Sequence, residues 1–124
     1  MREILFRGKR VDNGELVVGN SVLFFKDTTK IYGELTYWRE IEVIPETVGQ
    51  YTGLTDKNGE KIFEGDIIAK GFERYEVKWN AEQMRWGIYS DNYEVAGFTK
   101  FSEPYFEVIG NLYDNPELLR SENG

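Results

Sequence analysis

The sequence predicts a mostly-β fold: an SH3-like, partly open barrel with an N-terminal hairpin extension and a short C-terminal helix. Short β-branched and aromatic runs alternate with turn residues at close intervals, which is typical of barrels and sandwiches. Before the C-terminus, no window of a dozen residues carries the apolar stripe of an amphipathic helix. At 124 residues, 40% of them hydrophobic, the chain fits a single domain over residues 1–124, with 121–124 as a flexible tail.

The first elements expected are a hairpin and a set of short strands. Asn13-Gly14 lies between two apolar segments, and this dipeptide is the strongest short-range hairpin signal. The strands predicted after it are residues 21–26, 31–37 and 41–44. Residues 45–54 carry several turn-forming residues and are predicted to form a long connecting loop.

The centre of the chain predicts two tight turns. Asp56-Lys57-Asn58-Gly59 separates two strand-like segments, so Asn58 or Gly59 should take a left-handed conformation. Glu64-Gly65-Asp66 makes the second turn, in which the Asp66 carboxylate can accept backbone N–H bonds. The residues interpreted as structural turn residues are Asn58, Gly59, Gly65 and Asp66.

The second half predicts a long hairpin, a later strand and one helical turn. Tyr75, Val77 and Trp79 alternate with charged residues, so they share one face of a strand. Met84, Trp86 and Ile88 repeat the pattern after a short connection, which predicts a pair of strands. A further strand is expected over residues 105–109. Asn115 and Pro116 then suit the N-cap and first position of a helix of one or two turns.

Composition excludes several classes of catalytic site. The chain has no cysteine and no histidine, which excludes disulfides, thiolate metal sites, a cysteine nucleophile and a Ser-His-Asp triad. Its glycines form no phosphate-cradling pattern. The carboxylates of Glu60, Glu64 and Asp66 lie close in sequence, but their spacing does not match a calcium loop. We therefore expect neither an enzyme nor a bound cofactor or metal.

Charge and hydropathy indicate a soluble cytoplasmic protein without a membrane partner. The longest purely apolar run is Val22-Leu23-Phe24-Phe25, far too short to span a bilayer, and the N-terminus does not read as a signal peptide. The net charge of −7 disfavours nucleic acid unless a local basic patch exists. Four basic residues near the N-terminus could form such a patch or an ordinary solvated face: Arg2, Arg7, Lys9 and Arg10.

Two groups of aromatic residues are candidates for contacts. Tyr37 and Trp38 are adjacent, so in a strand they would point to opposite faces and leave one exposed beside Arg39, as a protein-contact anchor. The alternatives are a buried pair in an irregular loop or partial cover by neighbouring residues. The second group could be a base-stacking platform or simply core: Tyr75, Trp79, Trp86 and Tyr89, with Arg74, Lys78 and Arg85 nearby.

Three segments of the chain carry a family resemblance: Met1-Arg2-Glu3-Ile4 with Phe6-Arg7 at the start, residues 50–68 in the middle and residues 107–119 at the end. The middle segment, QYTGLTDKNGEKIFEGDII, is long and unusual. These segments resemble the YopX family of bacteriophage and prophage proteins, and all three occur in the family's order. The resemblance implies a β-rich fold with an SH3-like barrel, a phage or prophage origin and expression in a bacterial cytoplasm. It implies no activity and no catalytic residue.

These observations favour a non-enzymatic protein-interaction module of phage origin that contacts a host or phage protein, or itself. Edge strands of small barrels can pair between subunits, so such a module can form a homo-oligomer. The alternative is a nucleic-acid-binding accessory protein that uses the basic residues named above. An acidic decoy that mimics DNA is a third hypothesis, which the 15 basic residues of the chain make weaker.

Overall fold

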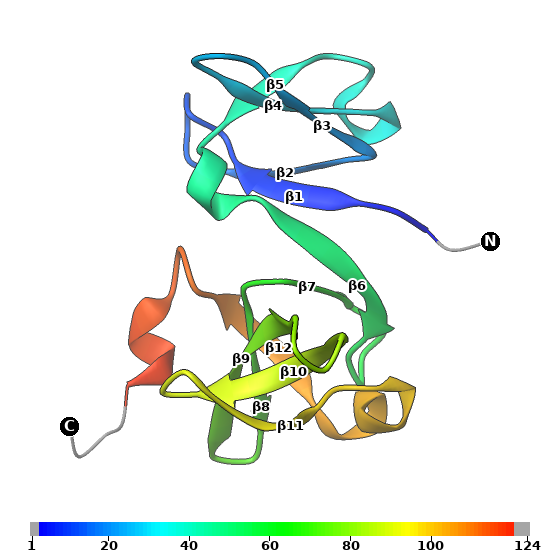
Figure 1. Ribbon diagram of the computed structural model, residues 1–124, viewed down its shortest axis with the longest axis vertical. Coiled ribbons are helices and arrows are strands. Elements are labelled where there is room, and N and C mark those ends of the chain that lie inside the picture. Colours follow the sequence, from blue (N-terminus) through cyan, green and yellow to red (C-terminus); the bar gives the residue numbers. More distant parts are fainter. Residues whose placement is uncertain (1–2, 121–124) are drawn as a thin grey trace. The chain divides into compact units, whose positions relative to one another are not determined.

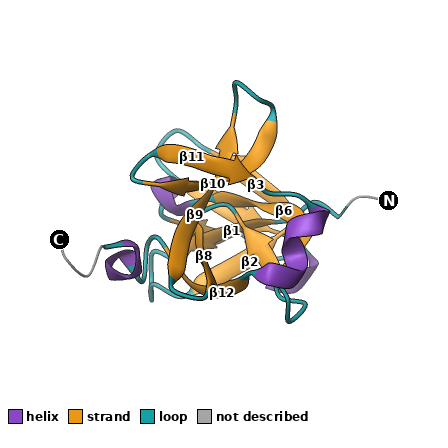
Figure 2. Cartoon of the chain, turned by 90° about the horizontal axis from the view of Figure 1, so that it is seen from below, coloured by secondary structure: helices purple, strands orange, loops and turns teal. Residues whose placement is uncertain are grey.

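The computed structural model describes residues 3–120, and strands make up about half of them (Figures 1 and 2). The helical segments are short 3₁₀ turns, so the prediction of a mostly-β fold is confirmed. The contacts of the chain divide into an N-terminal unit, Met1–Tyr51, and a C-terminal unit, Thr52–Gly124. The expectation of one domain over the whole chain stays a prediction, and its flexible tail at 121–124 lies outside the described residues.

The N-terminal unit begins with the predicted hairpin. Strands β1 (Phe6–Lys9) and β2 (Leu16–Gly19) pair antiparallel, with Gly8 opposite Val17. The turn is closed by Gly14, whose φ of 72° suits glycine and whose N–H donates to Arg10 O at 3.0 Å. Strand β6 (Gly49–Thr55) pairs with the other side of β1 through Gln50 and Gly49.

A three-stranded antiparallel sheet completes this unit, which is therefore larger than a hairpin. Its order is β3-β4-β5, formed by β3 (Ser21–Phe24), β4 (Thr29–Tyr32) and β5 (Ile41–Val43). The side chains of Ile31 and Val43 are 0% and 1% exposed and form its centre. A Cβ at Gly8 would lie 3.1 Å from Val43 Cβ, so the absence of a side chain lets β1 pack closely on this core.

Two sequence predictions in this unit are wrong. The strand predicted over residues 31–37 ends at Tyr32, because Gly33 turns the chain into the 3₁₀ helix η1 (Glu34–Thr36) and Thr36 Oγ1 accepts the Gly33 N–H at 3.1 Å. The loop predicted over residues 45–54 is instead η2 (Pro45–Thr47) followed by β6. Gly53 misled the prediction, since β6 accommodates its φ of 85° inside the strand.

The C-terminal unit contains a five-stranded antiparallel sheet in the order β11-β10-β9-β8-β12, the half-barrel of the predicted architecture (Figure 1). Its strands are β8 (Asp66–Lys70), β9 (Glu73–Asn80), β10 (Arg85–Ser90), β11 (Tyr93–Gly97) and β12 (Glu107–Asn111). The buried core consists of Ile62, Ile68, Val77, Ile88, Phe98 and Phe106. Val77 on β9 faces Ile88 on β10, as the alternation of apolar residues predicts.

Strand β11 and the 3₁₀ helix η3 (Lys100–Tyr105) were not anticipated from the sequence. Because Tyr105 belongs to η3, the strand predicted over residues 105–109 begins only at Glu107. The short C-terminal helix is the single turn η4 (Pro116–Leu119). Asn115 occupies its N-cap but makes no capping bond, and its side-chain oxygen instead accepts the Asn111 N–H at 3.3 Å.

The central turn residues hold the C-terminal unit together. Strand β7 (Lys61–Phe63) follows the first turn, in which Gly59 has a φ of 82° and the Asn58 N–H donates to Asp56 Oδ1 at 2.8 Å. Gly65 has a φ of 91°, and the buried Asp66 accepts the Phe63 N–H at 2.8 Å. Residues 3–120 contain no helix long and apolar enough to cross a membrane.

Candidate functional site

The clearest candidate surface is the segment of residues 33–39, here named the aromatic loop. Three large apolar side chains of this loop face solvent: Leu35 is 63% exposed, Tyr37 85% and Trp38 62%. Together with Glu34 they line a hollow on the surface of the N-terminal unit. Single exposed apolar residues are ordinary on protein surfaces, but three within four positions form a patch.

Backbone hydrogen bonds fix the aromatic loop in place. The N–H groups of Tyr37 and Trp38 donate to Glu34 O and Gly33 O, both at 2.9 Å, and the Arg39 N–H donates to Thr36 O at 3.1 Å. The buried Thr36 hydroxyl also bridges the two ends of the loop, since Oγ1 accepts the Gly33 N–H and lies 2.7 Å from Arg39 O. The exposed side chains therefore project from a braced backbone.

Tyr37 and Trp38 both lie in the left-handed region, with φ values of 55° and 61°. The expectation that they occupy a strand and point to opposite faces is therefore wrong, and both rings are exposed instead of one. For residues with a Cβ this conformation costs about 1–2 kcal/mol each. Such strain persists only where the surrounding structure enforces it, and it concentrates at functional positions.

The aromatic loop continues onto the outer face of the β3–β4 hairpin. The Trp38 ring lies 5.6 Å from the Tyr32 ring, centroid to centroid. On the same strand pair, Lys30 Nζ lies 5.3 Å from the centre of the Phe25 ring, and Lys30 stands opposite Leu23. Polar and charged groups surround these side chains, including Arg39 and the ion pair of Lys30 with Glu40 at 4.0 Å.

Sequence reasoning selected Tyr37, Trp38 and Arg39 but missed Leu35 and the neighbouring Phe25. The signal that could have found Leu35 is the Gly33 to Thr36 segment, where glycine followed by a hydroxyl residue indicates a turn in place of a strand. An apolar residue inside such a turn has no sheet face against which to pack.

The structure engages Arg10 within the chain and places Arg7 and Lys9 together on strand β1. Arg10 is held by Asp12 through two hydrogen bonds of 2.9 and 2.7 Å, and this contact lowers the pKa of the Asp12 carboxyl. Arg7 and Lys9 share one side of β1, because the intervening Gly8 faces the core. Arg2 lies outside the described residues.

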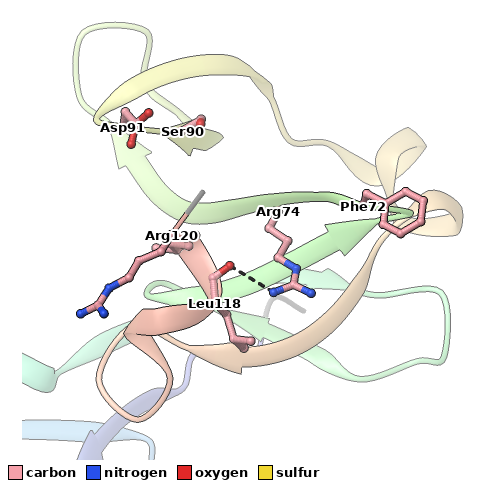
Figure 3. Close-up of a pocket in the computed structure, with 7 residues that line it drawn as sticks. Phe72, Arg74, Ser90, Asp91, Leu118 and Arg120 are labelled. Atoms are coloured by element: carbon pink, nitrogen blue, oxygen red, sulfur yellow. Dashed lines mark hydrogen bonds between the residues drawn. The ribbon is translucent and has the colours of Figure 1, made fainter. Parts of the chain in front are cut away.

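A second hollow lies in the C-terminal unit, between the turn of the β10–β11 hairpin and η4 (Figure 3). Its lining residues are Phe72, Arg74, Ser90, Asp91, Leu118, Leu119 and Arg120. Figure 3 shows the Arg74 guanidinium turned toward Leu118, to whose carbonyl Nη1 donates at 3.4 Å. The Arg120 side chain points away from Arg74, so the two cations do not converge on one point.

Glu76 and Tyr89 line an adjoining hollow. Burial raises the pKa of the Glu76 carboxyl, and the neighbouring Glu64 adds to this effect while Lys78 opposes it. Burial likewise raises the pKa of the Tyr89 hydroxyl, and Lys78 Nζ lies 5.3 Å from its ring centre. Residues 3–120 contain no group of three acidic side chains placed to hold a metal ion. These polar groups can contact a polar ligand.

The four aromatic residues considered as a stacking platform divide between two faces of the sheet. Trp79 and Trp86 meet edge to face at 5.1 Å, and Tyr75 packs against Phe106 at 6.3 Å, on the core side. Tyr89 is next to Ile88 in the strand and points to the other face. The nearby Arg85 forms an ion pair with Glu94. Tyr75 and Trp86 therefore pack against the core, whereas Trp79 is 41% exposed.

Comparison with known proteins agrees with this architecture. The crystal structure of protein EF1440 from Enterococcus faecalis is similar to the chain with a TM-score of 0.59 and 24% sequence identity, covering 94% of this chain and 98% of that one. This likeness shows the fold alone. No curated protein matches the chain. Residues 6–120 match the family described as YopX protein, which spans both units. The chain therefore belongs to the YopX family.

Proposed function

We propose that the protein is a non-enzymatic interaction module of a phage or prophage, which binds a host or phage protein in the bacterial cytoplasm through the aromatic loop. The observation that carries the proposal is the outward presentation of Tyr37 and Trp38 on a left-handed backbone. Strained residues other than glycine cluster at functional positions, and here two consecutive aromatic residues are held in a left-handed conformation.

The chemistry of the loop fits a protein partner. Tyrosine, tryptophan and arginine are the residues that most often dominate protein–protein binding energy, and the loop carries Tyr37, Trp38 and Arg39 in succession. Its backbone is already braced by hydrogen bonds, so little conformational entropy is lost when a partner binds. Ordering only the side chains keeps the cost of binding low.

The test is affinity capture from host cells that carry the active phage, performed with and without nuclease. The variant is Trp38→Ala, and the matched control is Phe101→Ala, because Phe101 is 90% exposed on η3 of the other unit. A stoichiometric protein that survives nuclease, is lost with Trp38→Ala and is retained with Phe101→Ala supports the proposal. Retention of the same protein by Trp38→Ala contradicts it.

Nucleic acid is the alternative partner, and the nuclease treatment addresses it directly. Two of the basic residues that would serve this role are engaged within the chain, Arg10 by Asp12 and Arg85 by Glu94. A capture that vanishes with nuclease and weakens steeply with salt would favour nucleic acid over a protein partner.

A further inference from the structure

Strand β3 is an unpaired edge of the sheet β3-β4-β5. The opposite edge is continued by the hairpin of the N-terminal unit, since Arg10 bridges to Val43 and the Val11 N–H donates to Glu42 O at 3.1 Å. On the outer side of β3, no further strand of the sheet continues the ladder of backbone hydrogen bonds. The strand therefore presents backbone groups along its outer side, as every edge strand does.

The hydrogen-bond pattern identifies which groups these are. The Phe25 N–H donates to Thr28 O at 2.8 Å, and the register continues with Phe24 opposite Thr29 and Leu23 opposite Lys30. Because bonded and non-bonded pairs alternate in antiparallel sheets, Ser21, Leu23 and Phe25 bond toward β4. The N–H and C=O groups of Val22 and Phe24 point outward, and within residues 3–120 no other segment pairs with them.

This edge lacks the features that usually block strand pairing. Residues 21–25 read Ser-Val-Leu-Phe-Phe, with no charge, no proline and no bulge. By contrast, the edge strand β11 has a break in register between Ile88 and Tyr89 of its neighbour, which distorts its outer side. Phe24 is 77% exposed and Phe25 52%, so apolar area accompanies the open backbone groups.

We propose that β3 pairs antiparallel with β3 of a second copy of this chain, around a two-fold axis at Leu23. This register places Val22 opposite Phe24 of the second copy, so their outward backbone groups form four hydrogen bonds across the axis. Leu23 then meets Leu23 of the second copy, and each phenylalanine meets a smaller side chain, with Phe24 against Val22 and Phe25 against Ser21.

Charge also favours a second copy as the occupant. Two copies of a chain of net charge −7 repel each other overall, but this register opposes only uncharged residues along the strand. At its end, Lys26 falls opposite Asn20, which carries no charge. The paired sheets would place the outer faces of both β3–β4 hairpins, with their aromatic side chains, on one continuous surface.

The test is the mass of the full chain by sedimentation equilibrium from micromolar to millimolar concentration. We expect a monomer–dimer equilibrium that Phe24→Lys weakens by at least about tenfold, because an edge lysine opposes pairing. Phe24→Pro removes the outward N–H donor and should act the same way. Tyr93→Lys on β11 is the matched control, since Tyr93 is 78% exposed on an edge without this role.

Two outcomes would overturn the proposal: a wild-type chain that stays monomeric at millimolar concentration, or a dimer that neither Phe24 variant weakens. Amide exchange of the wild-type chain gives an answer that does not depend on how the variants fold. The amides of Val22 and Phe24 should become protected as concentration rises. Protection that appears only with a captured partner would assign the edge to that partner in place of a second copy.

Discussion

Tyr37 and Trp38 adopt the same backbone conformation for the same local reason. Backbone hydrogen bonds to Gly33 O and Glu34 O close the turn after η1. Neither residue can adopt an extended backbone conformation while these bonds are present. Glycine adopts φ values such as their 55° and 61° with far less steric strain than an aromatic residue does. Stability and binding therefore make opposite demands on these positions.

Tyr37→Gly should stabilise the chain while it weakens partner binding. Tyr37 is 85% exposed, so few contacts are lost, and relief of the left-handed strain should raise the free energy of unfolding by about 1 kcal/mol. Chemical denaturation measures this change. A clear loss of stability would show that the tyrosine ring contributes to the fold and would contradict the interpretation of strain.

Gly65→Val should destabilise the C-terminal unit by about 2 kcal/mol or more. The φ of Gly65 is 91°, and a Cβ at this position would lie 3.1 Å from Tyr113 Cε2. Gly71→Val is the control, because its φ of 62° is also left-handed but no atom lies within 4 Å of its Cβ position. In thermal unfolding, Gly65→Val should have a lower melting temperature than Gly71→Val. An unchanged melting temperature for Gly65→Val would contradict the claim that the turn at residue 65 requires glycine.

Glu76→Gln should stabilise the chain at neutral pH, and the gain should fade in acid. Burial raises the pKa of Glu76 in the folded state above its unfolded value, so the folded state binds the proton more tightly. Stability is therefore lost as pH rises through the window between the unfolded and the raised folded pKa. Glutamine avoids this loss, whereas at pH below the ordinary glutamate pKa of about 4.3 the two side chains are both neutral.

Melting temperatures at pH 7 and in mild acid measure the effect. Glu60→Gln is the matched control, since Glu60 is exposed and its substitution should change the melting temperature little at either pH. A chain that Glu76→Gln destabilises at pH 7 would mean that the carboxylate has a stabilising partner in the folded state.

Asp56 joins the turn at residues 56–60 to strand β12. Its Oδ1 accepts the N–H groups of Asn58 and Glu60 at 2.8 and 2.9 Å, and its Oδ2 accepts the N–H of Val108 on β12 at 2.9 Å. The Leu112 N–H also donates to Gly65 O at 2.8 Å. The middle and final segments that carry the family resemblance therefore bond to each other, which explains them as scaffold.

Asp56→Asn tests this junction. An amide nitrogen can replace only one of the two carboxylate oxygens, so the substitution leaves either the Val108 N–H or the N–H groups of Asn58 and Glu60 without an acceptor. An unsatisfied buried donor costs about 1–3 kcal/mol. We expect a lower free energy of unfolding together with faster amide exchange at Val108, or at Asn58 and Glu60. Asp12→Asn, at an exposed position, is the control. Unchanged exchange at all three amides would argue against the junction.

Elements with strong local signals were predictable, and those set by tertiary contacts were not. The Asn13-Gly14 hairpin and the strand pair around Val77 and Ile88 follow from turn chemistry and alternation. The end of β4 at Tyr32 depends on Thr36 folding back onto Gly33, and the alternation of residues 31–37 does not reveal this. Strand β11 was missed because Tyr93 and Val95 are exposed, so burial leaves little pattern in its sequence.

The candidate site was predictable only in part, for a related reason. Adjacent aromatic residues and an arginine indicate a contact surface, and this selected Tyr37, Trp38 and Arg39. Their shared exposure depends on two left-handed residues, a conformation rarely expected of aromatic side chains. The hollow of the C-terminal unit shown in Figure 3 is lined by Phe72 and Arg74 together with residues 90–91 and 118–120. These segments are distant in sequence, and only the fold brings them together.

At the scale of the whole molecule, the family match covers residues 6–120 and hence both compact units. The segments that carry the resemblance through residues 50–68 and 107–119 lie almost wholly in the C-terminal unit. The aromatic loop and the β3 edge both belong to the N-terminal unit. The proposed contacts therefore lie in one unit, and the junction at Asp56 lies in the other.

Binding of a partner to the aromatic loop is tested most directly by the affinity of a captured partner for the wild-type chain and for Tyr37→Gly, measured after nuclease treatment by calorimetry. We expect Tyr37→Gly to bind the partner at least about tenfold more weakly, because an aromatic anchor is lost, although this variant is no less stable than the wild type. Binding equal to that of the wild type would show that the partner is held elsewhere and would contradict the assignment of the aromatic loop.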